Sequence, residues 1–225
     1  MSDGTTVRFD PHVHSAASYD ADVAVDRLLE RAAARGLDAI AVTDHDAIEG
    51  SLRAVERAPD HGVLAVPGVE VSTADGHLLA LGVKSRPDPG RSLPVTVDAV
   101  RALGGVSVVP HPFQRSRHGA PAAAIRDADP DAIEVLNAHT LLGVRNDQAR
   151  SFAARHDLPG VGASDAHAAS LVGRGYTDVA VEGDAPVTAD AVLDGLRRGR
   201  SRPGGRRTTA GQFLRKYLVN ASLLG

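Results

Sequence analysis

The residues of this sequence that are best suited to chemistry are histidines and carboxylates that recur in short clusters. The first cluster is the segment 10–15, which contains His12 and His14. Side chains alternate along a strand, so this His-x-His pair would place two imidazoles on one face, where both could bind one metal ion. Such a pair is also common among ordinary surface histidines. Its interpretation therefore depends on whether the other clusters converge on it.

The other clusters share a position relative to the predicted strands. Each lies at or just after the end of a strand, except His77, which begins one. In a parallel α/β sheet or barrel the carboxyl ends of the strands lie together, and active sites collect there. The residues concerned are Asp44, His45, Asp46, Glu70, His77, His111, Asp165 and His167. Their shared placement predicts one site, because independent surface histidines would not be expected to follow strand ends.

The donor types of these clusters indicate the kind of metal. The chain has no cysteine, which excludes disulfides, thiolate ligands and cysteine nucleophiles. Imidazole and carboxylate donors suit Zn, Mn or Fe, with Mg less suited to a histidine-rich site. Glu70 could bridge two ions with its two oxygens. Two ions roughly 3.5–4 Å apart would activate water and stabilise an in-line displacement at phosphorus.

Hydrophobic periodicity predicts the elements that must position these clusters. Helices are expected over 21–35, 47–57, 95–103, a short Ala-rich stretch after 118, 143–156 and 188–198, with a C-terminal helix over 212–224. Strands are expected over 7–9, 37–42, 63–66, 69–72, 77–83, 106–109, 132–136, 160–163 and 177–181. Thr188 is the expected N-cap of its helix. The alternation of strands and helices predicts an α/β domain with a parallel sheet, open or closed into a barrel.

Composition sets the remaining bounds. The 225 residues favour a single domain, and a net charge of -3 gives no global pointer to nucleic acid or membrane. The start of the chain has no targeting signal, and no apolar run is long enough to span a bilayer, so a cytoplasmic protein is expected. The basic segment 197–207 is interpreted as a solvated loop, with a role in holding phosphate or nucleic acid as the alternative.

Several single residues have both a structural and a functional interpretation. Arg115, Arg117 and His118 follow His111 and could grip a phosphate, but the same residues would suit a solvated loop. Arg174 is a weaker candidate for the same task. Asp20 precedes a helix and is placed to cap it. His61 and His156 are expected to be surface or capping residues, and His139 stands between a structural and a functional interpretation. Glu134 lies in an apolar strand and is expected to have a polar partner.

Taken together, the motifs resemble those of the PHP (polymerase and histidinol phosphatase) domain family. The matching segments are 10–15, 43–46, 68–71, 110–112 and 164–167, and they cover nearly the whole chain in the family's order. The resemblance implies a distorted (β/α)7 TIM-like barrel with a di- or trinuclear metal site and phosphoesterase activity. The spacings between the later motifs are short, which implies that the inserted subdomain of some small family members is missing.

The resemblance also implies a ligand set. One ion would be held by His12, His14, Glu70 and Asp165; a second would share Glu70 and add His77 and His111; a third would be held by Asp20, His45 and His167. This implied role moves Asp20 from helix cap to ligand. Some members carry a histidine in place of Asp20, so the third site of this chain is expected to be weaker.

The function predicted at this point is a metal-dependent phosphoesterase that uses metal-activated water. Its expected substrate is small and phosphorylated, a nucleotide or a short oligonucleotide, and no obligate protein partner is inferred. A histidinol-phosphatase-like phosphomonoesterase is one alternative. A metal-dependent amidohydrolase is another, although the only lysines, Lys84 and Lys216, lie outside the clusters. A non-catalytic metal-binding module is the third.

Overall fold

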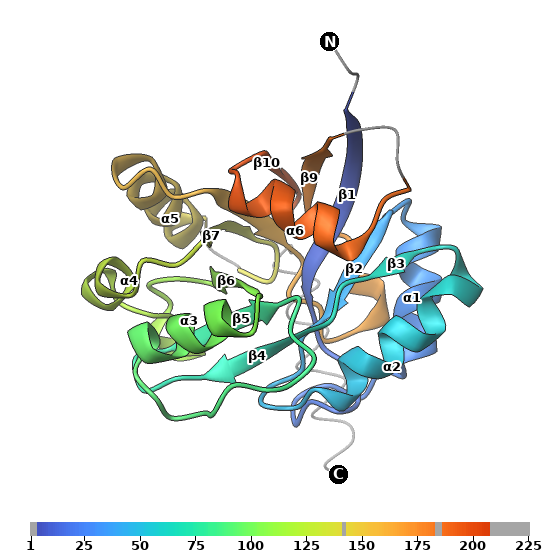
Figure 1. Ribbon diagram of the computed structural model, residues 1–225, viewed down its shortest axis with the longest axis horizontal. Coiled ribbons are helices and arrows are strands. Elements are labelled where there is room, and N and C mark those ends of the chain that lie inside the picture. The colour runs from blue at the N-terminus through green and yellow to red at the C-terminus, as the bar shows by residue number, and fades with distance from the viewer. Residues whose placement is uncertain (1–3, 141–142, 183–185, 208–225) are drawn as a thin grey trace.

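The computed structural model describes residues 4–140, 143–182 and 186–207, and it places the strands in two five-stranded sheets (Figure 1). The first sheet has the order β10-β9-β1-β2-β3. Its strands are β1 (Thr5–Val13), β2 (Ala39–Val42), β3 (Leu64–Ala65), β9 (Gly175–Val181) and β10 (Ser201–Gly205). β1, β2 and β3 are parallel, whereas β9 runs antiparallel to both β1 and β10.

The second sheet has the order β4-β5-β6-β7-β8. Its strands are β4 (Gly68–Ser72), β5 (His77–Leu81), β6 (Val106–Val109), β7 (Ala132–Asn137) and β8 (Gly160–Ala163). β6, β7 and β8 are parallel, and β5 is antiparallel to both β4 and β6. The reversal of β5 brings its first residue, His77, opposite Ser72 at the carboxyl end of β4.

Most of the helices cover the outer faces of the sheets, and the last one, over 189–197, packs against core residues of both sheets. The helices are α1 (Val25–Ala34), α2 (Glu49–Arg57), α3 (Leu93–Ala102), α4 (Ala122–Ala128), α5 (Val144–Arg155) and α6 (Ala189–Arg197), with three 3-10 turns, η1 (Ala58–His61), η2 (Arg115–Arg117) and η3 (Ala169–Leu171). Figure 1 shows α1 and α2 beside β2 and β3, and α3, α4 and α5 around the second sheet. The helices thus leave the carboxyl ends of the parallel strands uncovered, and the clusters lie in these strand ends and in the loops that follow them.

Two helices illustrate why these residues form these elements. Val25, Leu28, Leu29 and Ala32 of α1 are all buried, which confirms the spacing i, i+3, i+4, i+7 that predicted the helix. At α6 the Thr188 hydroxyl accepts a hydrogen bond from the Ala191 N–H at 3.2 Å, so the predicted N-cap is confirmed.

The carboxyl ends of strands from both sheets meet. Isolated bridges join Val13 to Ala166 and His45 to Glu70, and the Asp165 N–H donates to the His12 carbonyl at 2.9 Å. These links cross from the first sheet to the second at the ends of β1, β2, β4 and β8. The predicted convergence of the clusters is therefore a property of the fold.

The expected α/β class is confirmed, whereas the expected barrel is not, and one expectation about a loop was wrong. The resemblance implied one distorted barrel, but the ladders of the described residues form two mixed sheets and no closed barrel, because the strand ends of the two sheets are joined by isolated bridges instead of continuous ladders. The basic segment 197–207, expected as a loop, contains β10, whose backbone pairs with β9. The expected helix over 212–224 lies outside the described residues.

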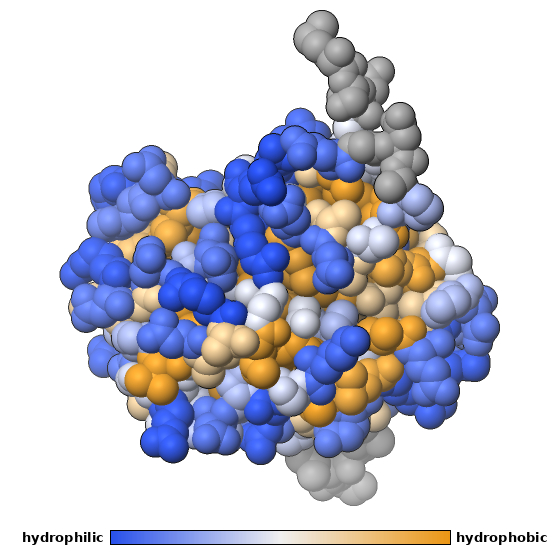
Figure 2. All heavy atoms as spheres, viewed as in Figure 1, coloured by the Kyte–Doolittle hydropathy of each residue, from blue (hydrophilic) through white to orange (hydrophobic). Residues whose placement is uncertain are grey.

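The surface agrees with this layering. On the face seen in Figure 2, hydrophilic side chains dominate the outer helices, and apolar atoms are visible mainly between them, nearer the centre. None of the helices in the described ranges has the length and apolar character needed to cross a membrane.

Candidate metal centre

Glu70 is the centre of the site, and each of its carboxylate oxygens faces a different set of imidazoles. Its Oε1 lies 2.9 Å from His77 Nδ1 and 3.1 Å from His111 Nε2. Its Oε2 lies 3.0 Å from His12 Nε2, 3.3 Å from His14 Nε2 and 3.4 Å from His45 Nδ1. Glu70 is fully buried. The side chain therefore has the arrangement of a bridging group, with one oxygen for each half of the cluster.

His12 is fixed in orientation by a second carboxylate. Its Nδ1 lies 2.7 Å from Glu134 Oε1, and the other oxygen of Glu134 accepts from the His111 N–H at 2.8 Å. A histidine that donates its Nδ1 proton in this way presents the lone pair of Nε2 to the site. The sequence-based expectation that Glu134 has a polar partner is confirmed.

Asp20, His45 and His167 form a second group at the edge of the cluster. Asp20 Oδ2 lies 2.8 Å from His167 Nε2 and 3.6 Å from His45 Nε2. The helix that Asp20 was first expected to cap begins at Val25, with Ala24 as its N-cap residue. The side chain of Asp20 is 32% exposed, whereas that of Glu70 is 1% exposed, so this group is the more open part of the site.

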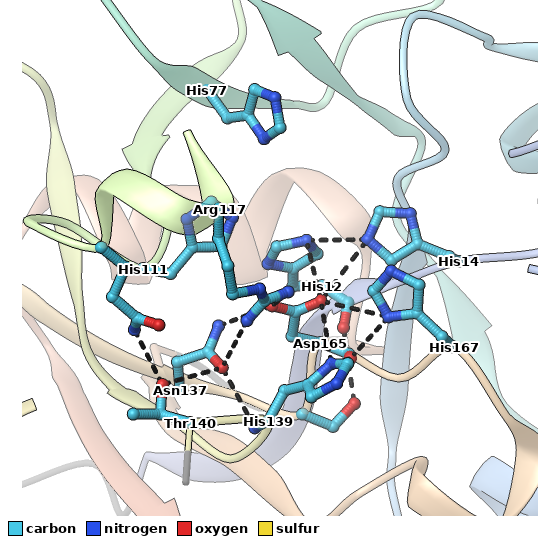
Figure 3. A network of polar contacts seen from close by, with 12 residues as sticks. His12, His14, His77, His111, Arg117, Asn137, His139, Thr140, Asp165 and His167 are labelled. Carbon is cyan, nitrogen blue, oxygen red and sulfur yellow. Dashed lines mark hydrogen bonds and ion pairs between the residues drawn. The ribbon is translucent and has the colours of Figure 1, made fainter. Parts of the chain in front are cut away.

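Asp165 closes the cluster on the side of β8. It lies two residues after that strand and adopts a left-handed backbone conformation with a φ of 51°. Its Oδ1 lies 3.4 Å from His167 Nδ1 and 3.7 Å from His12 Nε2, while its Oδ2 accepts from the Asn137 amide at 2.8 Å. Figure 3 shows this carboxylate between the histidines and the side chains of Asn137 and Arg117.

The carboxylates shift the basicity of the buried histidines. Burial alone lowers the pKa of His14, but the carboxylates of Asp165 and Glu70 outweigh it and raise that pKa to about 9. The pKa of His12 is raised well above its usual value in the same way. In contrast, burial lowers the pKa of His167 to about 4. Burial would raise the pKa of Glu70, yet the charge of His12 and the hydrogen bond with His111 hold it well below its usual value.

The remaining carboxylates of the predicted clusters support loops instead of facing the site. Asp44 accepts from the backbone N–H of Ser15 at 2.6 Å and from its hydroxyl at 2.7 Å. Asp46 accepts from the Ser72 N–H at 2.9 Å. Asp10 is fully buried, and it accepts from the N–H groups of Ser164 and Gly173. These bonds hold the loops after β1, β2 and β8 in place.

The chemistry of the donor set fits divalent cations. Within each of five overlapping groups, imidazole nitrogens and carboxylate oxygens lie within 4.8 Å of one another, and most of these residues are buried. Two ligand atoms that each lie ~2.0–2.2 Å from one ion are themselves ~3–3.5 Å apart. The Nε2 atoms of His12 and His14 lie 3.0 Å apart. Asp165 Oδ1 is buried without a hydrogen bond to any described residue, as a metal-binding oxygen would be.

The expected substrate residues separate into two places. Arg115 and His118 line a pocket of about 850 Å³ that adjoins His77, together with the exposed ring of Tyr19. Arg117 points the other way and forms an ion pair with Asp165. Arg174 donates to the Arg207 carbonyl, and the structure gives it no contact with the cluster among the described residues.

The sequence left the position of His139 relative to the cluster open. His139 Nδ1 lies 3.0 Å from the Asp165 carbonyl oxygen, at the edge of the cluster. It follows the end of β7, so the rule that selected the other clusters could have found it. His61 lies 3.3 Å from Asp26, and His156 is the C-cap residue of α5, so both are remote from the site, as expected. Lys84 follows β5, at the end of that strand opposite His77.

Two protein-family models match the chain. The family model described as PHP domain matches residues 10–145, and the model described as PHP-associated matches residues 143–201. An uncharacterized protein of Methanocaldococcus jannaschii is 30% identical over 119 residues, which are 53% of this chain and 69% of that protein.

Two relatives with named activities match over shorter segments. The phosphoribosyl 1,2-cyclic phosphate 1,2-diphosphodiesterase of Eggerthella lenta is 41% identical over 33% of this chain and 30% of its own length. The 5'-3' exoribonuclease of Haemophilus influenzae is 40% identical over 30% of this chain and 24% of its own length. The chain therefore spans less than a third of either enzyme.

The fold has counterparts among solved structures. A two-domain protein from Bacteroides vulgatus, described as containing a predicted PHP-like metal-dependent phosphoesterase, superimposes with a TM-score of 0.76 at 21% identity. The superposition covers 91% of this chain and 66% of that one. At this identity the likeness concerns the fold alone.

Proposed function

Since the chain belongs to the PHP domain family and is a metal-dependent phosphoesterase, we propose that it hydrolyses a phosphate ester of a nucleotide or short oligonucleotide at a centre of two or three ions. The observation that carries this proposal is the position of Glu70, whose two oxygens face separate sets of imidazoles. A structural carboxylate would need far fewer partners. A carboxylate that bridges two cations requires this arrangement.

The proposed ligands are the residues expected from the sequence, and their side chains lie next to one another in the cluster. They are His12, His14, Asp20, His45, Glu70, His77, His111, Asp165 and His167. Manganese, iron or zinc would suit these nitrogen and oxygen donors, with magnesium less suited.

The chemistry divides between the ions and the chain. Bound divalent ions would lower the pKa of water and neutralise charge on the phosphoryl oxygens. The protein supplies the rest: Glu70 and Asp165 provide negative charge, and Glu134 orients His12. Burial of these groups excludes bulk water, which strengthens every electrostatic interaction in the site.

The pocket beside His77 supports the nucleotide assignment. Tyr19 is 79% exposed, and its ring stacks on His45 with a centroid distance of 4.9 Å and an interplanar angle of 21°. An exposed aromatic ring at the mouth of a pocket is a stacking platform for a base. Arg115 lines the same pocket and makes no ion pair with a described residue, so its guanidinium is free to bind a phosphate.

The names of the two relatives with known activities are consistent with this substrate class. One acts on a phosphoribosyl cyclic phosphate and the other on RNA. Both substrates join a ribose to phosphate, and both therefore present an anion next to a sugar. We propose the same combination for the substrate of this chain.

Two comparisons test the proposal. The protein, freed of ions with a chelator and reloaded with Mn²⁺, is assayed on a phosphomonoester, a phosphodiester and a nucleoside 3',5'-bisphosphate. Hydrolysis of at least one ester is expected, and inactivity on all three with a folded, ion-loaded protein would contradict the phosphoesterase activity. Rates on nucleotides, short oligonucleotides and histidinol phosphate are then compared. A strong preference for histidinol phosphate would overturn the nucleotide assignment.

A further inference from the structure

Two arginines of the same turn have opposite surroundings. Arg115 and Arg117 are two residues apart in η2, but Arg115 is exposed in the pocket, whereas the side chain of Arg117 is only 26% exposed. Arg117 Nη2 lies 2.5 Å from Asp165 Oδ2, and its Nη1 donates to Asn137 Oδ1 at 3.4 Å. In Figure 3 the guanidinium of Arg117 enters the cluster between these two side chains.

The two carboxylate oxygens of Asp165 have different surroundings. Its Oδ2 is bound by Arg117 and by the Asn137 amide, whose Nδ2 lies at 2.8 Å. Its Oδ1 has no hydrogen bond to any described residue and faces His12, His14 and His167 at 3.4–3.7 Å. The carboxylate therefore presents only Oδ1 to these histidines, while Oδ2 is bound by Arg117 and Asn137 on the opposite side.

Asn137 and Arg117, the two partners of Asp165 Oδ2, are themselves held in place by hydrogen bonds. The Asn137 amide also donates to Glu134 Oε2 at 2.8 Å, and the Asn137 backbone is held by Asn146. The turn that carries Arg117 is tied to the same region, because the Gln114 amide donates to the Thr140 hydroxyl at 2.7 Å. Both partners of Asp165 Oδ2 are thus fixed to the end of β7 and to the segment that follows it.

Moving Arg117 to a substrate would leave a buried charge without its partner. Asp165 is fully buried, and removing one member of a buried ion pair is strongly destabilising because the other charge is left uncompensated. Arg115 makes no ion pair with a described residue, and it already lies in the pocket. The two arginines therefore suit different tasks, although they are neighbours in sequence.

We propose that Arg117 is a positioning residue for the metal centre, which holds Asp165 so that its Oδ1 alone faces the ion, and that Arg117 is not a ligand of the substrate. This inference rests on the proposed function. It differs from the sequence-based expectation for Arg117. Outer groups that orient a ligand change metal affinity ~10–100-fold when they are replaced.

The test compares two matched variants of the whole chain with metal ions alone as the probe. Arg117→Met keeps a similar length but removes the charge and the donors, and Arg115→Met makes the same change two residues away. Each protein is loaded with Co²⁺, and two quantities are measured: the visible absorption of the bound ion and the rate of its transfer to a chelator. Thermal unfolding of each ion-free variant confirms that it is folded.

For Arg117→Met we expect a changed Co²⁺ spectrum and transfer to the chelator that is ~10–100-fold faster, since Asp165 is no longer held. Arg117→Lys, which keeps the charge and a donor, should recover part of the loss. Arg115→Met should keep the parent spectrum and rate, while its KM for a phosphate ester increases. If Arg117→Met keeps both metal properties of the parent, the inference is overturned. Because no turnover is measured for Arg117, this outcome is independent of whether the proposed substrate is correct.

Discussion

The side chains around Glu70 and those that line the pocket beside His77 are held in different ways. Around Glu70, buried carboxylates and imidazoles contact one another, and most have two or more polar partners. In the pocket, Tyr19 and His118 are exposed, and each stacks on a histidine of the cluster, Tyr19 on His45 and His118 on His77 at 5.2 Å. Changes in the first region should act on the ions, and changes in the second should act on substrate affinity.

This division has a physical origin. A buried charge must be compensated by specific partners, so the geometry of the cluster is fixed by the fold. An exposed side chain has no such requirement and is free to meet a ligand. The arginines of η2 show both situations within three residues.

The largest expected effect follows from replacing the central carboxylate. Glu70→Gln removes the charge and one of the two oxygens that face the imidazoles. We expect kcat to fall by ~10³-fold or more and at least one ion to be lost. Metal content by elemental analysis and turnover of a phosphodiester would measure both effects. Glu56→Gln, on the exposed face of α2, is the matched control and should leave both unchanged. A fully active Glu70→Gln enzyme would remove the basis for a bridging role.

A smaller effect is expected one step away from the ions. Glu134→Gln keeps the shape of the side chain but weakens its hold on His12 Nδ1, which lies 2.7 Å away. Metal affinity should decrease ~10–100-fold, while the fold is retained. The decrease is measured by competition with a chelator, and exposed Glu30→Gln is the control. Unchanged affinity would show that Glu134 does not orient His12.

The pocket should respond differently from the cluster. Tyr19→Ala removes the ring that stacks on His45, and base stacking on an aromatic side chain contributes ~1–3 kcal/mol. We expect KM for a nucleotide to increase ~5–100-fold, with little change for ribose phosphate, which has no base. Tyr19→Phe retains the ring and should behave as the parent. Equal effects of Tyr19→Ala on both substrates would contradict a base-stacking role.

The smallest expected effect concerns the pH dependence of stability. In the ion-free protein the pKa of His14 is about 9, against an ordinary value of 6.5. The folded state binds this proton more tightly than the unfolded state, so the resulting stabilisation is complete below pH 6.5 and is lost as the pH rises through about 9. Thermal unfolding in chelator should therefore show Tm falling by ~5 °C over this range.

Bound ions should reverse that trend. A divalent ion requires a neutral imidazole, so its stabilising effect should grow as the pH rises over the same interval. Unfolding curves measured with and without Mn²⁺ would diverge with increasing pH. Curves that remain parallel would show that the ion does not displace the proton of His14.

The sequence predicted the cluster well because its members follow a local rule. His12, His45, His111 and Asp165 all come at or just after the ends of strands, and strand ends can be recognised from hydrophobic runs and the glycines and prolines between them. His77 fitted the rule only as an exception. The structure explains it, since β5 runs antiparallel and starts at the end of the sheet where β4 stops.

Gly76 makes that hairpin possible, and the sequence contains a signal for it. Its φ of 141° is unfavourable for other residues, and a Cβ there would lie 2.7 Å from the Ala120 N atom. An Asp-Gly pair between two apolar runs indicates a hairpin, so the reversal of β5 was within reach. The ion pair of Arg117 was not, because the directions of two arginines in a short turn depend on tertiary contacts with Asn137 and Asp165.

The measurement that tests the central claim most directly is a titration of the ion-free protein with Mn²⁺, in which bound metal and phosphodiester hydrolysis are followed together. We expect at least two ions per chain, with activity that appears as the ions bind to the residues around Glu70. A folded protein that binds fewer than two ions, or that binds them and hydrolyses no phosphate ester, would contradict the account.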